Sequence, residues 1–278
     1  MPCFIMIVAL YGYPIVMTLV QSFHKINLLG GQMDFVGLSN FKKIFADPGF
    51  YKTLRITFKY TFVTVILKIG LGFLSAFLLS KALFGKKLLR FLFLIPWAIP
   101  QVAVSTLFTW ILNGDYGYLN YFLLKFNLIS QPIRFLSNPD IALYCVGFVD
   151  AWIGISLVAM MFLSGLQAIN SSLYEACEID GGGAFRKFID VTVPGIKQVF
   201  MTTLILVTIW TFNSFNVIYV LTQGGPMRST ETLIIRIYEE AFSRFDLGMS
   251  ATLSVISFVI LLVLTFFYIR RLINNEES

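Results

Sequence analysis

The sequence predicts an all-α membrane protein with six transmembrane helices in a single domain, residues 1–278. Hydrophobic residues make up 57% of the chain and charged residues only 13%, whereas about a quarter of the residues in a soluble domain are charged. Apolar runs of about 20 residues, enough to cross a hydrocarbon core of about 30 Å, recur along the chain. Helices are favoured over strands because backbone polar groups in lipid must be paired within the segment itself.

Six apolar runs define the predicted spans. Lys68 and Asp150 are the two charged residues that fall within them. We expect Pro14 to kink the first run, and Pro96 and Pro100 to kink the third. The first run has no basic leader and no small-residue cleavage site, so we expect it to be a retained span rather than a signal peptide. The runs are 2–23, 61–80, 91–112, 141–168, 199–220 and 249–269.

The composition argues against most enzymes. The chain has one histidine, His24, and three scattered cysteines, which cannot form a multi-histidine metal site or a disulfide framework. It contains no G-x-x-x-x-G-K-[ST] loop for ATP, and no G-x-S-x-G or H-E-x-x-H motif. The net charge of +6 is explained by Lys and Arg residues that flank membrane spans, without a nucleic-acid partner. We therefore expect no catalytic, metal or cofactor site in this chain.

The orientation of the spans rests on one short connection. If both termini face the cytoplasm, basic residues are equally numerous on the two sides. The ten-residue connection 81–90 nevertheless concentrates four of them, and short loops dominate the positive-inside rule. Arg270 and Arg271 follow the last run and agree with this choice. We expect both termini, and the connection 170–198, to be cytoplasmic.

The connection between the fourth and fifth runs has the pattern of two short helices. Ser172-x-x-Glu175 reads as a capping box that starts the first helix. The three glycines at 181–183 end it, because glycine adopts left-handed conformations without a Cβ penalty. A second helix is expected over 184–191, stopping before Pro194. The result is a compact cytoplasmic elbow.

This elbow resembles the EAA motif of ATP-binding-cassette importer permeases, E-A-A-x-x-x-G followed nine residues later by I-x-L-P. The spacing is kept throughout, and the departures at Cys177, Val191 and Val193 are similar in size or apolar. Without the spacing match, the segment reads equally well as an ordinary structured loop. The residues that carry the resemblance are Glu175, Ala176, Cys177, Gly181, Val191, Val193 and Pro194.

Three further segments resemble the sugar branch of that family, the permeases for oligosaccharides and glycerol phosphate. They are Phe35-Val-Gly-Leu-Ser-Asn-Phe41, Ile95-Pro-Trp-Ala-Ile-Pro100, and Tyr219-Val-Leu-Thr-Gln-Gly-Gly-Pro226 with Thr230-Glu-Thr232. The resemblance implies the type I importer permease fold, with the elbow seated in a groove of a cytosolic ATPase and used for mechanical coupling through Glu175, Ala176, Cys177, Gly181 and Pro194.

The resemblance also implies partners and a location. It implies a heterodimeric pore with a second permease in a lipid bilayer, two cytosolic ATPase subunits that bind ATP and Mg²⁺, and an extracytoplasmic solute-binding protein. The expected location is the cytoplasmic (inner) membrane of a bacterium or archaeon. Which sugar would be carried does not follow from the sequence.

Lys68 and Asp150 are predicted to lie at similar depths near the middle of the bilayer. An intramembrane charge is costly and usually faces a partner or a cavity. The two residues can form a structural bridge, or pair with the sister subunit. Direct contact of Asp150 with a sugar is the alternative.

Other polar residues suggest a substrate path. Trp210, Asn213 and Asn216 recur every third residue of the fifth run and would share one helical face. Amides suit sugar hydroxyls and an indole suits the apolar side of a sugar ring, although Asn also bonds membrane helices to one another. Trp97 and Gln101 stand beside the prolines of the third run, where freed carbonyls would border a cavity, although Trp97 also fits ordinary packing.

These features predict a permease subunit of an ATP-driven sugar importer that works by alternating access. One alternative keeps the family but changes the cargo to a polyamine, phosphate or another anion. A second is a proton- or sodium-coupled carrier with Lys68 and Asp150 as its relay. An integral membrane enzyme is disfavoured, because no nucleophile or acid-base cluster is evident in the sequence.

Overall fold

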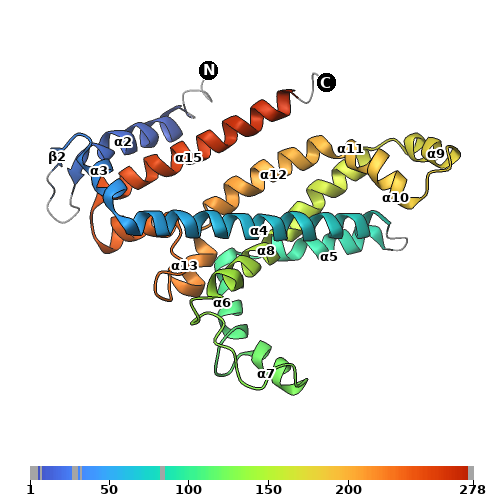
Figure 1. Cartoon of the computed structure of the whole chain (residues 1–278), viewed down its shortest axis with the longest axis horizontal. Coiled ribbons are helices and arrows are strands. Elements are labelled where there is room, and N and C mark those ends of the chain that lie inside the picture. The colour runs from blue at the N-terminus through green and yellow to red at the C-terminus, as the bar shows by residue number, and fades with distance from the viewer. Residues whose placement is uncertain (1–5, 7, 27–30, 32, 82–84, 275–278) are drawn as a thin grey trace.

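The structure, a computed structural model, describes residues 6, 8–26, 31, 33–81 and 85–274. It is helical, as predicted, apart from a short antiparallel hairpin of β1 (His24–Ile26) and β2 (Met33–Phe35). Several long helices run along the longest axis, with α9 and α10 at one end and α7 projecting to the side (Figure 1). The helices are η1 (Val8–Gly12), α2 (Tyr13–Ser22), α3 (Ser39–Ala46), α4 (Pro48–Lys81), α5 (Lys86–Ala98), α6 (Gln101–Ile111), α7 (Tyr118–Lys125), α8 (Ala142–Ala168), α9 (Ser171–Ile179), α10 (Ala184–Lys187), η2 (Phe188–Thr192), α11 (Val193–Gly195), α12 (Lys197–Phe212), α13 (Asn216–Thr222), α14 (Leu233–Tyr238), η3 (Glu239–Ser243) and α15 (Leu247–Asn274).

Long apolar helices occupy the predicted spans. Within the described residues, three helices are long and apolar enough to cross a bilayer alone: Pro48–Lys81, Ala142–Ala168 and Leu247–Arg270. Two bent helix pairs pass the same test when each is taken as one span, and Val8–Ser22 is a shorter apolar helix. The count of six spans stays a prediction. Residues 2–5 and 7 of the first predicted span lie outside the described residues.

The third predicted span is broken rather than kinked. Its two halves, α5 and α6, meet at an angle of 86°. Pro96 lies inside α5, and Pro100 occupies the N-cap position of α6 with an extended ψ of 129°. Two prolines four residues apart each remove a backbone donor, so the chain turns where a single proline would only bend it.

The centre of the molecule is the contact between α4 and α8, which lie against each other along most of their length. Glycines permit the close approach. A Cβ on Gly72 would come within 2.5 Å of the Val158 side chain, and one on Gly147 would come within 2.8 Å of Thr64 Oγ1. Small residues at such contacts are typical of helices packed within a membrane. This contact fixes the positions of the side chains that α4 and α8 share.

The N-terminal helix is tied to the last helix, and α2 and α15 lie side by side (Figure 1). Thr252 Oγ1 donates to the Ser22 carbonyl at 3.1 Å. Asn40 Nδ2 donates to the carbonyls of Ser22 and His24 at 3.1 and 2.9 Å. Asn40 belongs to the predicted sugar-branch segment 35–41, and here it holds the hairpin against the ends of both helices.

Candidate functional site

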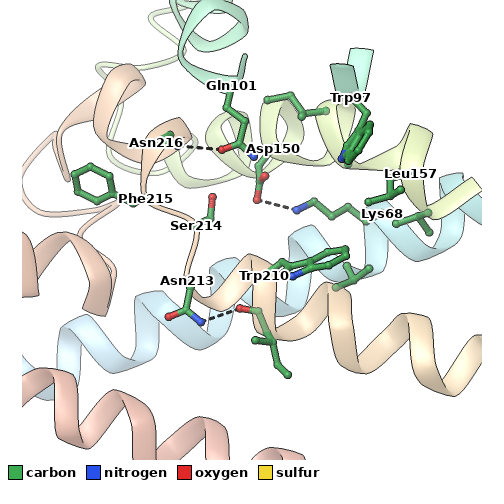
Figure 2. Close-up of a pocket in the computed structure, with 15 residues that line it drawn as sticks. Lys68, Trp97, Gln101, Asp150, Leu157, Trp210, Asn213, Ser214, Phe215 and Asn216 are labelled. Atoms are coloured by element: carbon green, nitrogen blue, oxygen red, sulfur yellow. Dashed lines mark hydrogen bonds and ion pairs between the residues drawn. The ribbon is translucent and has the colours of Figure 1, made fainter. Parts of the chain in front are cut away.

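A cavity of about 510 Å³ opens between α4, α5, α8, α12 and the start of α13 (Figure 2). Its wall combines two tryptophans, several amides, a hydroxyl, an ion pair and aliphatic side chains, a mixture typical of small-molecule sites. All six residues of the predicted substrate path line it, together with Lys68. The residues that line it are Lys68, Trp97, Gln101, Asp150, Ile153, Gly154, Leu157, Val158, Val207, Ile209, Trp210, Asn213, Ser214, Phe215 and Asn216.

The structure brings the two intramembrane charges together. Lys68 Nζ lies 3.0 Å from Asp150 Oδ2, and both residues are buried. Tyr60 donates its hydroxyl to the same carboxylate oxygen at 2.8 Å, and Lys68 also donates to Thr211 Oγ1 at 3.0 Å. A Cβ on Gly154 would come within 2.7 Å of Lys68 Cε, so this glycine leaves the space that the lysine occupies. The cavity wall therefore carries two charges that neutralise each other within the protein.

The neutral polar groups gather at a break in the fifth predicted span. The prediction of one helix with Trp210, Asn213 and Asn216 on a single face was wrong, because α12 ends at Phe212 and α13 begins at Asn216. Asn213 Nδ2 donates to the Ile209 carbonyl at 3.0 Å, and such a side-chain bond competes with the helical ladder. The three residues nevertheless all line the cavity, Asn213 from the break itself and Trp210 and Asn216 from the helices on either side of it.

An amide bridge joins the two broken segments across the cavity. Asn216 Nδ2 donates to Gln101 Oε1 at 3.2 Å, and Gln101 is the first residue of α6. Figure 2 shows Trp97 and Trp210 on opposite sides of the Lys68 side chain, and each indole is 51% exposed. The cavity therefore presents aromatic surfaces beside amides whose remaining donors and acceptors are within reach of a ligand.

Sequence reasoning missed some residues of this site. Tyr60 reads as one more aromatic residue at the start of an apolar run, and Gly154 as one more glycine in another. Phe215 lines the cavity and stacks on Tyr219 with a centroid distance of 5.0 Å. Tyr60 and Gly154 each act through a residue on another helix, and Phe215 lies in the break between α12 and α13, so no spacing pattern within one apolar run could have identified them.

The elbow begins and ends with local capping interactions. The predicted capping box at Ser172 was wrong: α9 begins at Ser171, and the Asn170 side chain accepts from the Ser172 backbone N–H at 3.1 Å. An Asn at the N-cap is as effective as Ser and sits here two residues earlier. At the other end Gly181 has φ +79°, and the Gly182 N–H donates to the Cys177 carbonyl at 2.7 Å. This is a Schellman ending, so the glycine run ends the helix as predicted.

The second half of the elbow is longer than predicted. Helical structure runs from Ala184 through Gly195 and includes a π-helical turn, whereas the sequence predicted a stop before Pro194. Pro194 is the second residue of α11 and follows closely on the π-helical turn Phe188–Thr192. A proline cannot donate the regular α-helical hydrogen bond, and the irregular turn lies at this point. The segment then meets α12 at 62°. Pro194 thus marks the joint between elbow and span.

Contacts between its two halves brace the elbow. Lys187 Nζ lies 2.7 Å from Glu178 Oε2, which joins α10 to α9. The hydroxyls of Tyr174 and Thr192 are 3.0 Å apart. The hydrogen bond from Lys187 and its positive charge lower the pKa of the Glu178 carboxyl below its usual range. The elbow is therefore held in one shape by its own side chains.

The exposed face of the elbow is more apolar than the motif suggested. Ile179 is 86% exposed and Phe185 is 76% exposed, and both lie beside the glycine run. Glu175 and Ala176 are exposed, whereas Cys177 is half-buried. A Cβ on Gly182 would come within 2.5 Å of Cys177 Sγ, so the cysteine packs inside the elbow rather than on its outer face.

Among the described residues, no three His, Cys, Asp or Glu side chains are grouped closely enough to hold a metal ion.

The chain resembles known permeases over nearly its whole length. It is 32% identical to the sulfoquinovosyl glycerol transport system permease protein SmoG of Agrobacterium fabrum over 97% of this chain and 87% of that protein. It is also 32% identical to the trehalose/maltose transport system permease protein MalF of Thermococcus litoralis, over 92% of this chain and 86% of that one. The sn-glycerol-3-phosphate transport system permease protein UgpA of Agrobacterium fabrum is 32% identical, over 97% and 91%.

Solved structures share the fold. A chain of a bacterial ABC transporter for the import of the acidic polysaccharide alginate superimposes with a TM-score of 0.84 at 17% identity, covering 98% of this chain and 92% of that one. The family described as binding-protein-dependent transport system inner membrane component matches residues 68–276. This match spans the residues of the cavity and of the elbow, and it confirms the predicted family. The chain belongs to the inner membrane components of binding-protein-dependent transport systems, and it is a transport subunit rather than an enzyme.

Proposed function

We propose that this chain is one of two permease subunits of an ATP-driven importer for a sugar or oligosaccharide. The observation that carries the proposal is the cavity at the break between α12 and α13. Its amides and indoles offer hydrogen bonds for hydroxyls and flat apolar surfaces for ring faces. The relatives named for sulfoquinovosyl glycerol and for trehalose and maltose support a saccharide cargo.

The charges in the cavity support an uncharged ligand or an uncharged part of one. Lys68 is paired with Asp150 and Asp150 also accepts from Tyr60, so neither offers a free charge to an ion. An anion or a polyamine bound by charge would have to separate this buried pair, which is costly. We therefore assign the pair a structural role that holds α4 and α8 in register beside the ligand.

The elbow is the proposed contact with the ATPase. Glu175, Ala176 and Gly181 lie in the motif by which such permeases couple, and Ile179 and Phe185 add exposed apolar surface. An element that passes on a conformational change must not deform itself, and the Lys187–Glu178 ion pair braces it. ATP and Mg²⁺ would be bound by the ATPase subunits, and the elbow would lie on the cytoplasmic side of the inner membrane.

Reconstitution tests the proposal. The chain would be co-purified with its partner permease and ATPase, placed in proteoliposomes and supplied with the cognate binding protein. We expect uptake of labelled neutral di- or oligosaccharides that requires ATP hydrolysis. A panel of maltose, trehalose, glycerol phosphate, spermidine and inorganic phosphate identifies the cargo class.

Two results would contradict the proposal. Uptake driven by a proton or sodium gradient without the ATPase would indicate an ion-coupled carrier. ATP-dependent uptake of spermidine or phosphate, with none of the saccharides transported, would keep the family but reject the sugar assignment.

A further inference from the structure

A second cavity, of about 320 Å³, lies between the elbow and the ends of α4 and α8. Ser80 and Lys81 contribute to it from α4, Tyr174 from α9, and Lys187 from α10. The transport mechanism proposed above uses Lys187 to brace the elbow but assigns no role to the cavity itself. Its apolar wall comes from Phe77, Leu166 and Phe188.

The cavity lies at the level where a bilayer surface would be. Lys81 is the last residue of one membrane-spanning helix, and Leu166 is two residues from the end of another. Basic residues at the ends of spans lie in the headgroup region. The wall of this cavity is therefore within reach of lipid phosphates as well as of the first acyl carbons.

The charge of the cavity is positive. Lys81 and Lys187 line it, and no carboxylate is among its lining residues in the described part of the chain. Lys81 Nζ lies 4.2 Å from the centre of the Phe77 ring, and among the described residues it forms no ion pair with a carboxylate. Lys187 is paired with Glu178, but that carboxylate is 71% exposed and is not among the residues that line the cavity. The lining therefore includes two ammonium groups and three hydroxyl residues, Ser80, Tyr174 and Thr192.

We propose that this cavity binds the phosphate headgroup of an anionic phospholipid, with Lys81 and Lys187 holding the phosphate. Basic pockets between membrane helices on the cytoplasmic side bind such headgroups. The apolar wall favours a lipid over free phosphate, since Phe77 and Phe188 offer contact to an acyl chain and nothing to an inorganic ion. With the elbow on the cytoplasmic side, the lipid would come from the cytoplasmic leaflet. The opposite orientation would change the leaflet and not the site.

A lipid bound here would join α4 to the elbow. The cavity is lined by residues of the span and by residues of α9, α10 and η2, so occupancy ties the position of the elbow to the bundle. Anionic lipid would then influence how a movement of the elbow is transmitted to the membrane-spanning helices. This effect is independent of which solute the importer carries.

Native mass spectrometry of the purified full-length chain tests the proposal. Phosphatidylglycerol and phosphatidylcholine with identical acyl chains would be added at matched concentrations. We expect preferential binding of phosphatidylglycerol, weakened about five-fold by Lys81→Gln, because one lysine near a charged lipid surface contributes about that factor. Ala184→Leu should also weaken binding, because Ala184 lines the cavity and the larger side chain fills it without changing charge.

The matched control is Lys125→Gln. Lys125 also lies over an aromatic ring four residues earlier, with its Nζ 5.7 Å from the centre of Tyr121, but on the projecting helix α7. It should leave phosphatidylglycerol binding unchanged. Equal binding of the two lipids, or equal losses in Lys81→Gln and Lys125→Gln, would overturn the proposal. So would displacement of the lipid by millimolar inorganic phosphate, which would identify a free-anion site. If Lys81→Gln does not fold, normal lipid binding by Ala184→Leu would reject the site.

Discussion

The cavity and the elbow each contain an ion pair of similar length, but the two pairs stand in opposite surroundings. Lys68 and Asp150 are 3.0 Å apart with side chains 8% and 5% exposed. Arg186 and Asp190 are 3.2 Å apart with side chains 63% and 53% exposed. Water screens the elbow pair, whereas the cavity pair depends on each partner to neutralise the other. Loss of the exposed Arg186–Asp190 pair should therefore cost little stability, whereas loss of one partner of the buried Lys68–Asp150 pair should cost much more.

The glycines of the two regions differ in the same way. Gly154 in α8 is required for space, because Lys68 occupies the position of a Cβ. Gly181 in the elbow has nothing within 4 Å of a Cβ but needs φ +79°. Gly154 is required by a side chain on another helix, and Gly181 is required by its own backbone conformation. The cavity is therefore specified by contacts across the fold, and the elbow by local structure.

The largest effect should come from breaking the buried pair. Asp150→Asn leaves the Lys68 ammonium without its carboxylate, and removing one partner of such a pair costs about 3–5 kcal/mol. We expect a large fall in the melting temperature of the purified chain and loss of uptake. Lys68→Met in the same chain should restore part of the stability.

Asp190→Asn on the elbow is the control, with an expected change within about 0.5 kcal/mol. If Lys68→Met gives no rescue, or if the two Asp→Asn variants are equally stable, the two pairs do not differ as described.

The next effect should come from the elbow backbone. Gly181→Val forces a β-branched residue into the left-handed region, which costs about 1–2 kcal/mol or more and disrupts the end of α9. We expect assembly with the ATPase and ATP-dependent uptake to fall to background, while membrane insertion is retained. Co-purification of the ATPase and uptake assays measure this.

Gly183→Val supplies the comparison within the same glycine run. Gly183 has an extended backbone with φ −73°, and nothing lies within 4 Å of its Cβ position. This variant should assemble and transport at close to the normal rate. Normal uptake by Gly181→Val would refute the coupling role of the elbow.

A smaller effect is expected from the wall of the cavity. Trp210→Ala removes one of the two indoles beside Lys68 and should reduce saccharide uptake about ten-fold, mainly through a higher apparent KM. Trp110→Ala removes a similarly exposed indole outside the cavity and should have little effect on uptake. Kinetics of uptake in proteoliposomes distinguish the two, and equal losses would mean that neither acts through ligand contact.

The smallest effect concerns pH. The pKa of Glu178 is lowered by Lys187, so its contribution to stability is full above the usual glutamate pKa and is lost as pH falls through the lower folded value. Hydrogen exchange of residues 171–195 should therefore quicken modestly in that acidic range. Lys187→Gln should abolish this pH dependence; if exchange has the same profile in both proteins, the brace contributes nothing.

The sequence could predict the elbow better than the cavity. The motif, the glycine ending and the exposed position of Glu175 all lie within one short segment, where spacing has a direct structural meaning. Two predictions there were wrong. The first helix is capped by Asn170 instead of Ser172, and the second continues through Pro194 instead of stopping before it, so each boundary shifts by a few residues within the same segment. The residues around the cavity were identified by their polarity in apolar runs, which is why Lys68, Asp150 and Gln101 were found.

What the sequence could not predict depends on more than one helix. The break after Phe212 looks like part of a continuous apolar run, because Asn213 and Ser214 are too few to interrupt it by composition. The Tyr60 hydroxyl and the space at Gly154 gain meaning only when α4 and α8 are side by side. Such contacts require the fold itself.

A movement of the elbow should change access to the cavity, and cysteine labelling tests this coupling most directly. The chain's own cysteines would be replaced, Asn213→Cys introduced, and its labelling rate measured in membranes that also contain the second permease and the ATPase, with and without ATP. We predict a labelling rate that changes with ATP when the elbow is intact and does not change in Gly181→Val. A labelling rate that responds to ATP equally in both proteins, or in neither, would contradict the claim.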